Sequence, residues 1–211
     1  MKNKNIKRMS NVVRLLTHEY PDSKCSLNYE NPFQLLVATI LSAQCTDERV
    51  NKVTSSMFKK YKDAKDFDSL PLSKIKQLVF STGFYNNKAK SIKKLSKIIC
   101  EKFNNKTPDN INELVELPGV GRKTANVLLG TYYNIPSIVV DTHVTRIVNL
   151  LGFCKTRNAV IIERELSKII NKKHWVKFTH LIIDHGRKVC IANRPKCEMC
   201  IIKDLCPSAI K

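Results

Sequence analysis

Apolar residues recur along much of this chain at the three- and four-residue spacing of amphipathic α-helices. In the segment from Lys88 to Phe103 they stand at Ile92, Leu95, Ile98, Ile99 and Phe103. Comparable patterns predict helices over residues 32–41, 47–61, 72–82, 111–117, 123–132, 158–170 and 174–189. Residues 135–140 are apolar but include Pro136, which favours an extended connection over a strand. The predicted fold class is therefore all-α.

Several of these helices carry end signals. Asn31 and Pro32 are residue types preferred at the N-cap and the first helical position. Thr46 or Asp47 is suited to cap the next helix, and Gly83 stands where the helix from Leu72 is expected to stop. With 211 residues and 43% hydrophobic content, the chain can bury one large core or two small ones.

The charge balance favours a polyanionic partner. Thirty-seven Lys and Arg oppose eighteen Asp and Glu, a formal net charge of +19. Lysine-rich composition spread over a solvated surface explains part of this excess, for example in residues 1–7 and 103–106. No stretch approaches the ~20 apolar residues of a membrane-spanning helix, and the basic residues are not confined to one amphipathic segment. We therefore expect a nucleic-acid partner and no membrane.

Segment 117–125, with the sequence LPGVGRKTA, joins two predicted helices through a tight turn. Gly119 and Gly121 permit positive backbone dihedrals and leave no side chain between the backbone and an approaching surface. The N–H groups at the start of the second helix then form an anion site. A Pro-Gly-x-Gly turn is also ordinary loop chemistry, but the adjoining Arg122 and Lys123 favour a phosphate.

Four cysteines, Cys190, Cys197, Cys200 and Cys206, follow the spacing C-x6-C-x2-C-x5-C. The apolar group near the N-terminus is short and broken by Arg14, so we expect no signal peptide and a reducing compartment without structural disulfides. A metal centre is the better interpretation, and the spacing leaves zinc and an iron–sulfur cluster both open. The other cysteines, Cys25, Cys45, Cys100 and Cys154, are expected to be plain reduced thiols.

Segment 117–125 resembles the helix-hairpin-helix of the endonuclease III family of DNA glycosylases, and segment 140–146, VDTHVTR, resembles the family's catalytic-aspartate segment. The cysteine spacing is similar to that of the family's cluster loop, which implies one 4Fe-4S cluster and makes zinc the minority interpretation. The resemblance covers nearly the whole chain and implies two lobes. One is a six-helix domain over residues 25–135, and the other is an iron–sulfur domain formed by residues 1–24 and 136–211.

The resemblance also implies base excision chemistry, with Lys123 and Asp141 as catalytic residues. A neutral lysine amine attacks the sugar C1′, expels the base and forms a Schiff base, after which β-elimination nicks the strand. The place of Lys123 near a helix start and beside Arg122 favours the neutral amine. Asp141 would accept a proton or stabilise positive charge on the sugar, and it is also suited to be a helix N-cap. Oxidised pyrimidines in duplex DNA are the substrates implied.

DNA contacts follow from the same resemblance. Gln44 and Phe84 match the two wedge positions that fill the space left by an extruded base, although the family usually has leucine at Phe84. From the residues alone, Gln44 would be an exposed helix-end amide and Phe84 a core aromatic. Gly119, Val120, Gly121 and Arg122 would hold the backbone, and Arg194 and Lys196 of the first cysteine loop would contact a phosphate, with a smaller contribution from Lys203.

Two alternatives remain open. Adenine glycosylases of the same superfamily lack a lysine at the position of Lys123, carry a catalytic glutamate where this chain has Thr39, and extend through a further C-terminal domain that we expect to be absent here. A non-catalytic DNA-binding module with a zinc-bound cysteine loop is the rival from another class. The combined expectation is a monomeric, cytoplasmic, nucleoid-associated DNA glycosylase and abasic-site lyase.

Overall fold

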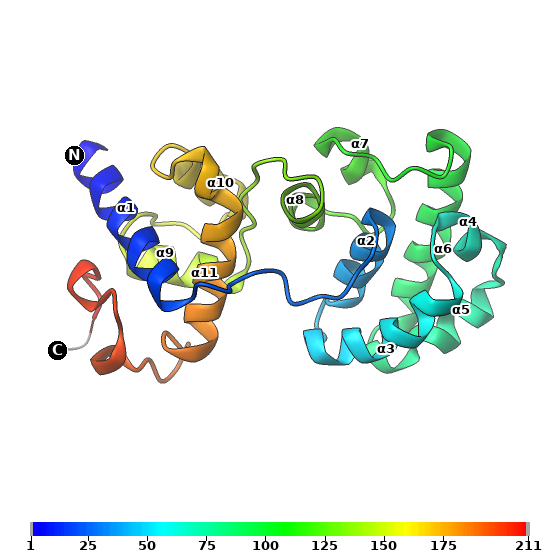
Figure 1. Cartoon of the computed structure of the whole chain (residues 1–211), viewed down its shortest axis with the longest axis horizontal. Helices are drawn as coiled ribbons and strands as arrows, with labels where there is room; N and C mark the ends of the chain where they lie inside the picture. Colours follow the sequence, from blue (N-terminus) through cyan, green and yellow to red (C-terminus); the bar gives the residue numbers. More distant parts are fainter. Residues whose placement is uncertain (1, 210–211) are drawn as a thin grey trace. The chain divides into compact units, whose positions relative to one another are not determined.

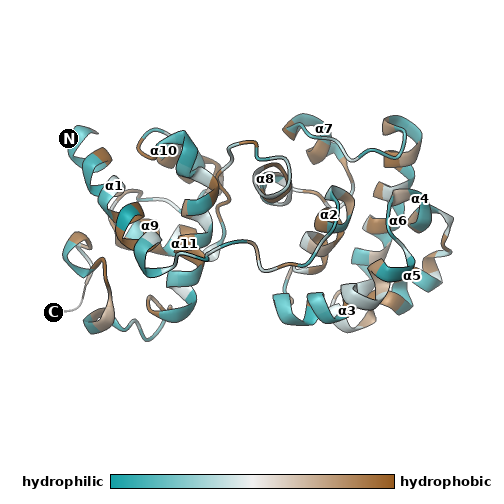
Figure 2. Cartoon of the chain, viewed as in Figure 1, coloured by the Kyte–Doolittle hydropathy of each residue, from teal (hydrophilic) through white to brown (hydrophobic). Residues whose placement is uncertain are grey.

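The computed structural model describes residues 2–209, and these contain helices, turns and connections but no strand (Figure 1). The all-α prediction is confirmed, and residues 135–140 form the expected extended connection. Figure 2 shows hydrophobic and hydrophilic positions sharing the same helices, as in amphipathic helices. Within residues 2–209 no helix combines the length and the hydropathy needed to cross a bilayer.

The chain forms two compact units. The terminal unit joins the residues up to Cys25 with those from Pro136 onward, and the central unit comprises Ser26–Ile135. The terminal unit contains α1 (Lys2–Glu19), α9 (Thr142–Leu150), α10 (Ala159–Ser167), α11 (Trp175–Lys188) and the 3-10 turns η2 (Lys172–His174), η3 (Cys197–Met199) and η4 (Lys203–Leu205). The central unit contains α2 (Pro32–Leu41), α3 (Asp47–Lys60), α4 (Ala64–Ser69), α5 (Leu72–Val79), η1 (Phe80–Thr82), α6 (Tyr85–Phe103), α7 (Ile111–Glu116) and α8 (Arg122–Thr131).

In the central unit, α6 packs against α4 and α5, and α2 packs against α3, α6 and α8. Helix α2 is buried on nearly all sides, and its N-cap is Asn31, whose side chain accepts the Gln34 N–H at 2.9 Å. The short α4 was not predicted, and it makes seven α-helices between residues 26 and 135 where the family resemblance implied six. Its six residues include only two apolar ones, Ala64 and Phe67, and the clearest local signal is Asp63, whose side chain caps the helix by accepting the Asp66 N–H.

In the terminal unit, α1 packs on α11 through residues that include the fully buried Met9, Val12 and Leu16. Arg8 ties α1 to the C-terminal segment, because its Nη1 donates to the Leu205 carbonyl at 3.2 Å and its guanidinium lies 4.2 Å from the centre of the Phe153 ring. Helices α9 and α11 approach closely at Gly186, where an added Cβ would lie 2.7 Å from His143 Nδ1 and 3.1 Å from Ile147 Cδ1.

We expect Gly186→Ala to destabilise the terminal unit by about 1–3 kcal/mol, because the methyl group overpacks the contact between α9 and α11. Trp175, the single tryptophan of the chain, begins α11 and reports on this unit by fluorescence during urea unfolding. Lys188→Ala, on the exposed side of the same helix, should lower the free energy of unfolding by less than ~1 kcal/mol, since it removes only the cation–π contact with the Tyr20 ring. Equal midpoints for Gly186→Ala and the wild type would show that α9 and α11 are less tightly packed than described.

Candidate active site and metal centre

The turn between α7 and α8 is closed by a backbone hydrogen bond from the Val120 N–H to the Leu117 carbonyl, at 3.0 Å. Pro118 occupies the second position of this turn and Gly119 the third, where φ is +81°. Proline followed by a residue with positive φ is the requirement of a type II turn. The predicted tight turn is confirmed.

Gly119 is also restricted by its neighbour. A Cβ at this position would lie 2.7 Å from the Cβ of Ser91 on α6, so the turn rests directly against that helix. A Cβ added at Gly121, in contrast, would meet no atom within 4 Å beyond its chain neighbours. The two glycines therefore serve different purposes: Gly119 lets the turn seat on α6, and Gly121 leaves the backbone uncovered on its other side.

Gly121 is the N-cap residue of α8, and a glycine has no side chain with which to cap the first turn. Lys123 is exposed in this first turn, as is Arg122. Val120, expected among the DNA contacts, has a side chain only 5% exposed, and its N–H is engaged in the turn. The helix start is thus an anion site formed by backbone and flanked by two cationic side chains.

Asp141 is the N-cap of α9, as the sequence indicated. Its Oδ1 accepts the Val144 N–H at 2.8 Å, and the residue is half-buried. This hydrogen bond holds the carboxylate in one orientation at the start of the helix. Lys123 belongs to the central unit and Asp141 to the terminal unit.

Gln44 and Phe84 both adopt the left-handed conformation that non-glycine residues seldom adopt, with φ of 53° and 48°. Both side chains are exposed, and Phe84 exposes 65% of its surface. The sequence-based alternative that Phe84 is a core aromatic is wrong: the residue follows Gly83 in a turn before α6 begins, so its ring lies outside the core. Strained conformations of exposed residues concentrate at functional sites.

Lys88, which the sequence did not single out, lies beneath these two turns. It is 7% exposed, and its Nζ donates to the carbonyls of Leu41 at 2.8 Å and Thr82 at 2.7 Å. Burial lowers its pKa from the usual lysine value. The missed signal is its spacing, since Lys88 stands four residues before Ile92 on the buried stripe of α6.

All four cysteines of the spacing motif line one cavity of about 210 Å³ in the terminal unit. They come from the segment after α11, from η3 and from the residues around η4. Among residues 2–209, no three His, Cys, Asp or Glu side chains converge closely enough to hold a metal ion as they stand. A cavity walled by four thiols suits a group of several atoms better than a single tetrahedral ion, whose ligand sulfurs lie ~2.3 Å from one centre.

Burial raises the pKa of Cys190 and raises that of Cys200 to about 11. Thiolates in this cavity therefore need a compensating cation, which a bound metal group supplies. The positive charge of the Arg146 guanidinium partly offsets this increase in the pKa of Cys190. Its Nη2 donates hydrogen bonds to the Cys190 and Gly186 carbonyls. The buried Nε of Arg146 has no hydrogen-bond partner within residues 2–209, which leaves one N–H beside this ligand set for an anionic acceptor.

A buried series of polar contacts, from Cys200 through His185 to Tyr20, lies beside the same cavity. His185 Nε2 lies 3.5 Å from the sulfur of Cys200, and His185 Nδ1 lies 3.1 Å from the hydroxyl of Tyr20. Burial lowers the pKa of His185 to about 4 and raises that of Tyr20 to about 12, so both are neutral near pH 7. Imidazoles and hydroxyls in such contacts orient metal ligands. The residues present fit the implied cluster.

The loop between the first two cysteines presents Arg194 and Lys196 as exposed residues. Its base is closed by a hydrogen bond from the Lys196 N–H to the Val189 carbonyl, at 3.0 Å. Both cationic side chains are therefore accessible to an external anion, while the backbone of the loop stays anchored to the terminal unit.

Comparison with known proteins agrees with this geometry. Residues 37–172 match the model of the HhH-GPD superfamily base excision DNA repair proteins. Endonuclease III of Synechocystis sp. is 47% identical over 96% of this chain and 93% of its own length. A solved structure of a non-covalent endonuclease III–DNA complex has a TM-score of 0.92 and 41% identity, covering 97% of this chain and 96% of the relative.

A second solved structure is that of a trapped endonuclease III–DNA covalent intermediate, with a TM-score of 0.91, 41% identity and the same coverage of both chains. Identity at this level over nearly the full length of both chains confirms the family resemblance. The chain belongs to the endonuclease III family of the HhH-GPD superfamily.

Proposed function

We propose that this chain is a bifunctional DNA glycosylase and abasic-site lyase of base excision repair, which releases oxidised pyrimidines from duplex DNA through Lys123. The observation that carries the proposal is the start of α8, where an open backbone anion site and the exposed Lys123 share one helical turn. The relative solved as a trapped covalent DNA intermediate supports covalent chemistry for the family.

In this proposal the uncharged Lys123 Nζ attacks C1′ of the damaged nucleotide, and the C1′–base bond breaks as the base leaves with its electron pair. The C1′–O4′ bond then breaks, O4′ takes up a proton as the amine loses its own, and the opened sugar is left as a Schiff base at C1′. Loss of a C2′ proton forms the C2′–C3′ double bond and expels the 3′ phosphate, which nicks the strand. The backbone at Gly119 and Gly121 and the side chain of Arg122 hold the phosphodiester close to the amine, so attack is intramolecular once DNA is bound.

Asp141 is suited to assist because its carboxylate is oriented before substrate arrives. The cap to Val144 N–H fixes the side chain, and a fixed charge need not reorganise when positive charge develops on the sugar. We assign it one of two alternative roles: accepting a proton from Lys123 or stabilising the developing cation.

Gln44 and Phe84 are proposed to enter the base stack when the damaged nucleotide is extruded. Their left-handed turns project an amide and an aromatic ring into solvent, as wedges require. The ring of Phe84 supplies more stacking surface than the leucine usual in the family.

Cys190, Cys197, Cys200 and Cys206 are proposed to hold one 4Fe-4S cluster in their shared cavity. When bound, this group supplies four metal–thiolate bonds and joins the C-terminal segment to α11. The loop carrying Arg194 and Lys196 lies between the first two ligands, so its conformation depends on them. Its cations are proposed to bind a DNA phosphate, with Lys203 a weaker candidate.

The adenine glycosylase alternative is disfavoured by Thr39. Its side chain is 9% exposed, and its hydroxyl donates to the Leu35 carbonyl at 2.7 Å, which leaves no carboxylic acid at that position of α2. A non-catalytic module would not need an exposed lysine in the first turn of α8. Because DNA is the substrate, we propose that the chain works in the cytoplasm at the nucleoid, as a monomer.

Replacing the proposed nucleophile gives the first functional test. Lys123→Gln should abolish the adduct trapped by borohydride on a duplex with an oxidised pyrimidine and slow base release at least ~10³-fold. DNA binding should persist, because the backbone of the turn is unchanged. Lys123→Arg is the matched control: it keeps the positive charge but forms no Schiff base, so it should bind DNA fully and remain untrapped. A trapped adduct in either variant would identify another amine as the nucleophile, and a loss of binding in Lys123→Gln alone would make Lys123 a phosphate contact.

Asp141→Asn should slow turnover by about 10²–10⁴-fold while binding is retained. Asparagine caps a helix as well as aspartate does, so α9 should keep its stability and only the charge and the proton acceptor are removed. Single-turnover base release and thermal unfolding, measured on the same preparation, separate the two effects. Unchanged base release would leave Asp141 with the capping role alone.

Anaerobically purified protein should be yellow-brown and contain about four iron and four sulfide per chain. Cys200→Ser should lower both contents and weaken DNA binding, whereas Cys25→Ser, outside the cavity, should leave them unchanged. A colourless protein with one zinc ion and full activity would overturn the cluster assignment.

Arg194→Ala or Lys196→Ala should weaken DNA binding for all sequences and reduce the slope of log K against log salt by ~1 per lost contact. Arg194→Lys keeps the charge, so its slope should match that of the wild type. Filter binding at several salt concentrations measures this, and equal slopes in both alanine variants would show that the loop is only a solvated turn.

A further inference from the structure

Lys88 is buried in the central unit, yet the reaction proposed above gives it no task. Its ammonium group meets two carbonyls from segments far apart in sequence, Leu41 at 2.8 Å and Thr82 at 2.7 Å. Leu41 is the last residue of α2 and Thr82 the last of η1. Carbonyls at helix ends lack intrahelical partners and carry the negative end of the helix dipole, so one cation here serves two helix ends.

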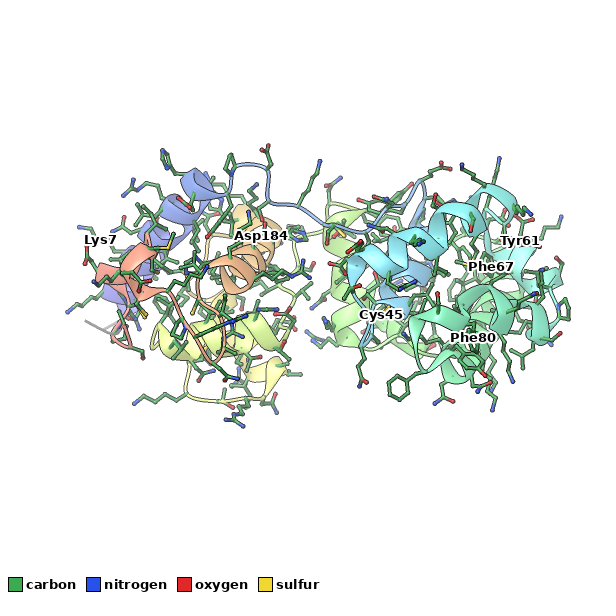
Figure 3. The ribbon with its side chains drawn as sticks, turned by 90° about the horizontal axis from the view of Figure 1, so that it is seen from below. Lys7, Cys45, Tyr61, Phe67, Phe80 and Asp184 are labelled. Carbon is green, nitrogen blue, oxygen red and sulfur yellow. The ribbon has the colours of Figure 1, made fainter. Side chains whose placement is uncertain are left out.

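The two helix ends lead directly into the two proposed wedges. Gln44 follows Leu41 by three residues, and Phe84 follows Thr82 by two. Both wedge residues are in the left-handed conformation, with φ of 53° and 48°. Cys45 and Phe80, labelled in Figure 3, mark the two segments in the side-chain view. The side chain of Lys88 is hydrogen-bonded to both segments.

Packing alone does not account for a lysine at this position. Burying an ammonium group costs free energy, and burial lowers the pKa of Lys88 accordingly. A methionine fills a similar volume without that cost and without needing acceptors. The feature that only the ammonium supplies is a hydrogen-bonded link between two turns.

We propose that Lys88 is a positioning residue that holds the Gln44 and Phe84 turns in the conformation needed to enter the duplex together. The inference rests on the proposed function of these two residues as wedges. Lys88 touches neither the DNA nor the reacting atoms. It acts through the turns, so its effect belongs to the extrusion of the base and not to the chemistry at C1′.

This role separates two substrates. A damaged base that is still paired must be unstacked, and both wedges must enter the duplex at that moment. A preformed abasic site has no base to unstack, so strand nicking there depends less on the wedges. The loss of Lys88 should therefore slow base release from a paired damaged base more than it slows nicking at a preformed abasic site.

The experiment compares Lys88→Met with the wild type in single turnover. Base release from a duplex with an oxidised pyrimidine should slow about tenfold or more, and nicking of a preformed abasic site should change less than about threefold. A 2-aminopurine placed beside the damaged base should show a smaller fluorescence rise on binding. Lys88→Gln keeps an N–H donor, so it should fall between the wild type and Lys88→Met, and it serves as the working variant if Lys88→Met does not fold.

A mutant cycle distinguishes positioning from general stability. If Lys88 acts through the wedges, adding Lys88→Met to a Gln44→Ala/Phe84→Ala variant should cause little further loss of base release. Equal losses on both substrates, or additive losses in the cycle, would overturn the positioning role while leaving the wedges in place. If Gln44→Ala and Phe84→Ala have no effect by themselves, the wedge assignment itself fails, and the role of Lys88 fails with it.

Discussion

Whether a helix start is capped by its own chain decides what can bind there, and the two helix starts of this site differ in that respect. Helix α8 begins at Gly121, which has no side chain, so its positive end is left to an external anion. Helix α9 begins at Asp141, which supplies its own carboxylate. The first start suits a phosphate, and the second is already capped by a carboxylate of its own chain. The turn seated on Ser91 and the burial of Val120 both serve to hold the first start in place.

Much of the fold could be predicted because the helices repeat their apolar residues clearly. The patterns for α2, α6 and α8 were correct in position to within a few residues, and the Asn31 and Asp141 caps were readable from single side chains. Helix α4 was missed because its six residues include only two apolar ones, Ala64 and Phe67, whereas the equally short α7 carries Ile111, Leu114 and Val115 at helical spacing. For short elements, tertiary packing rather than periodicity decides the structure.

The site was predictable only where the sequence is contiguous. The turn at residues 117–121 and the four cysteines are local motifs. The turn forms as expected, and the four cysteines line one cavity. The family resemblance implied an exposed Phe84, but the residues alone could not predict it, because one glycine before it decides whether the ring faces the core or solvent. Lys88 was hidden for a related reason: a lysine in a helical stripe resembles a solvated side chain until its acceptors, from two distant segments, are known.

The cysteine cavity and the core of the terminal unit share a wall. Ile147, Leu151 and Ile202 line the cavity and also belong to the buried cluster that packs α1, α9 and α11 together. Filling the cavity and completing the core are therefore coupled, in the way that metal binding contributes to folding in small metal domains.

The terminal unit draws its first helix from one end of the chain and the helix it packs on from the other, which has a consequence for synthesis on the ribosome. Helix α1 emerges first, but its partner α11 is made only after the whole of Ser26–Ile135. At translation rates of roughly 5–20 residues per second, Met9, Val12 and Leu16 wait on the order of ten seconds without the surface that buries them. Domains generally fold as units during synthesis, so the central unit can fold in that interval while the apolar face of α1 stays accessible to chaperones.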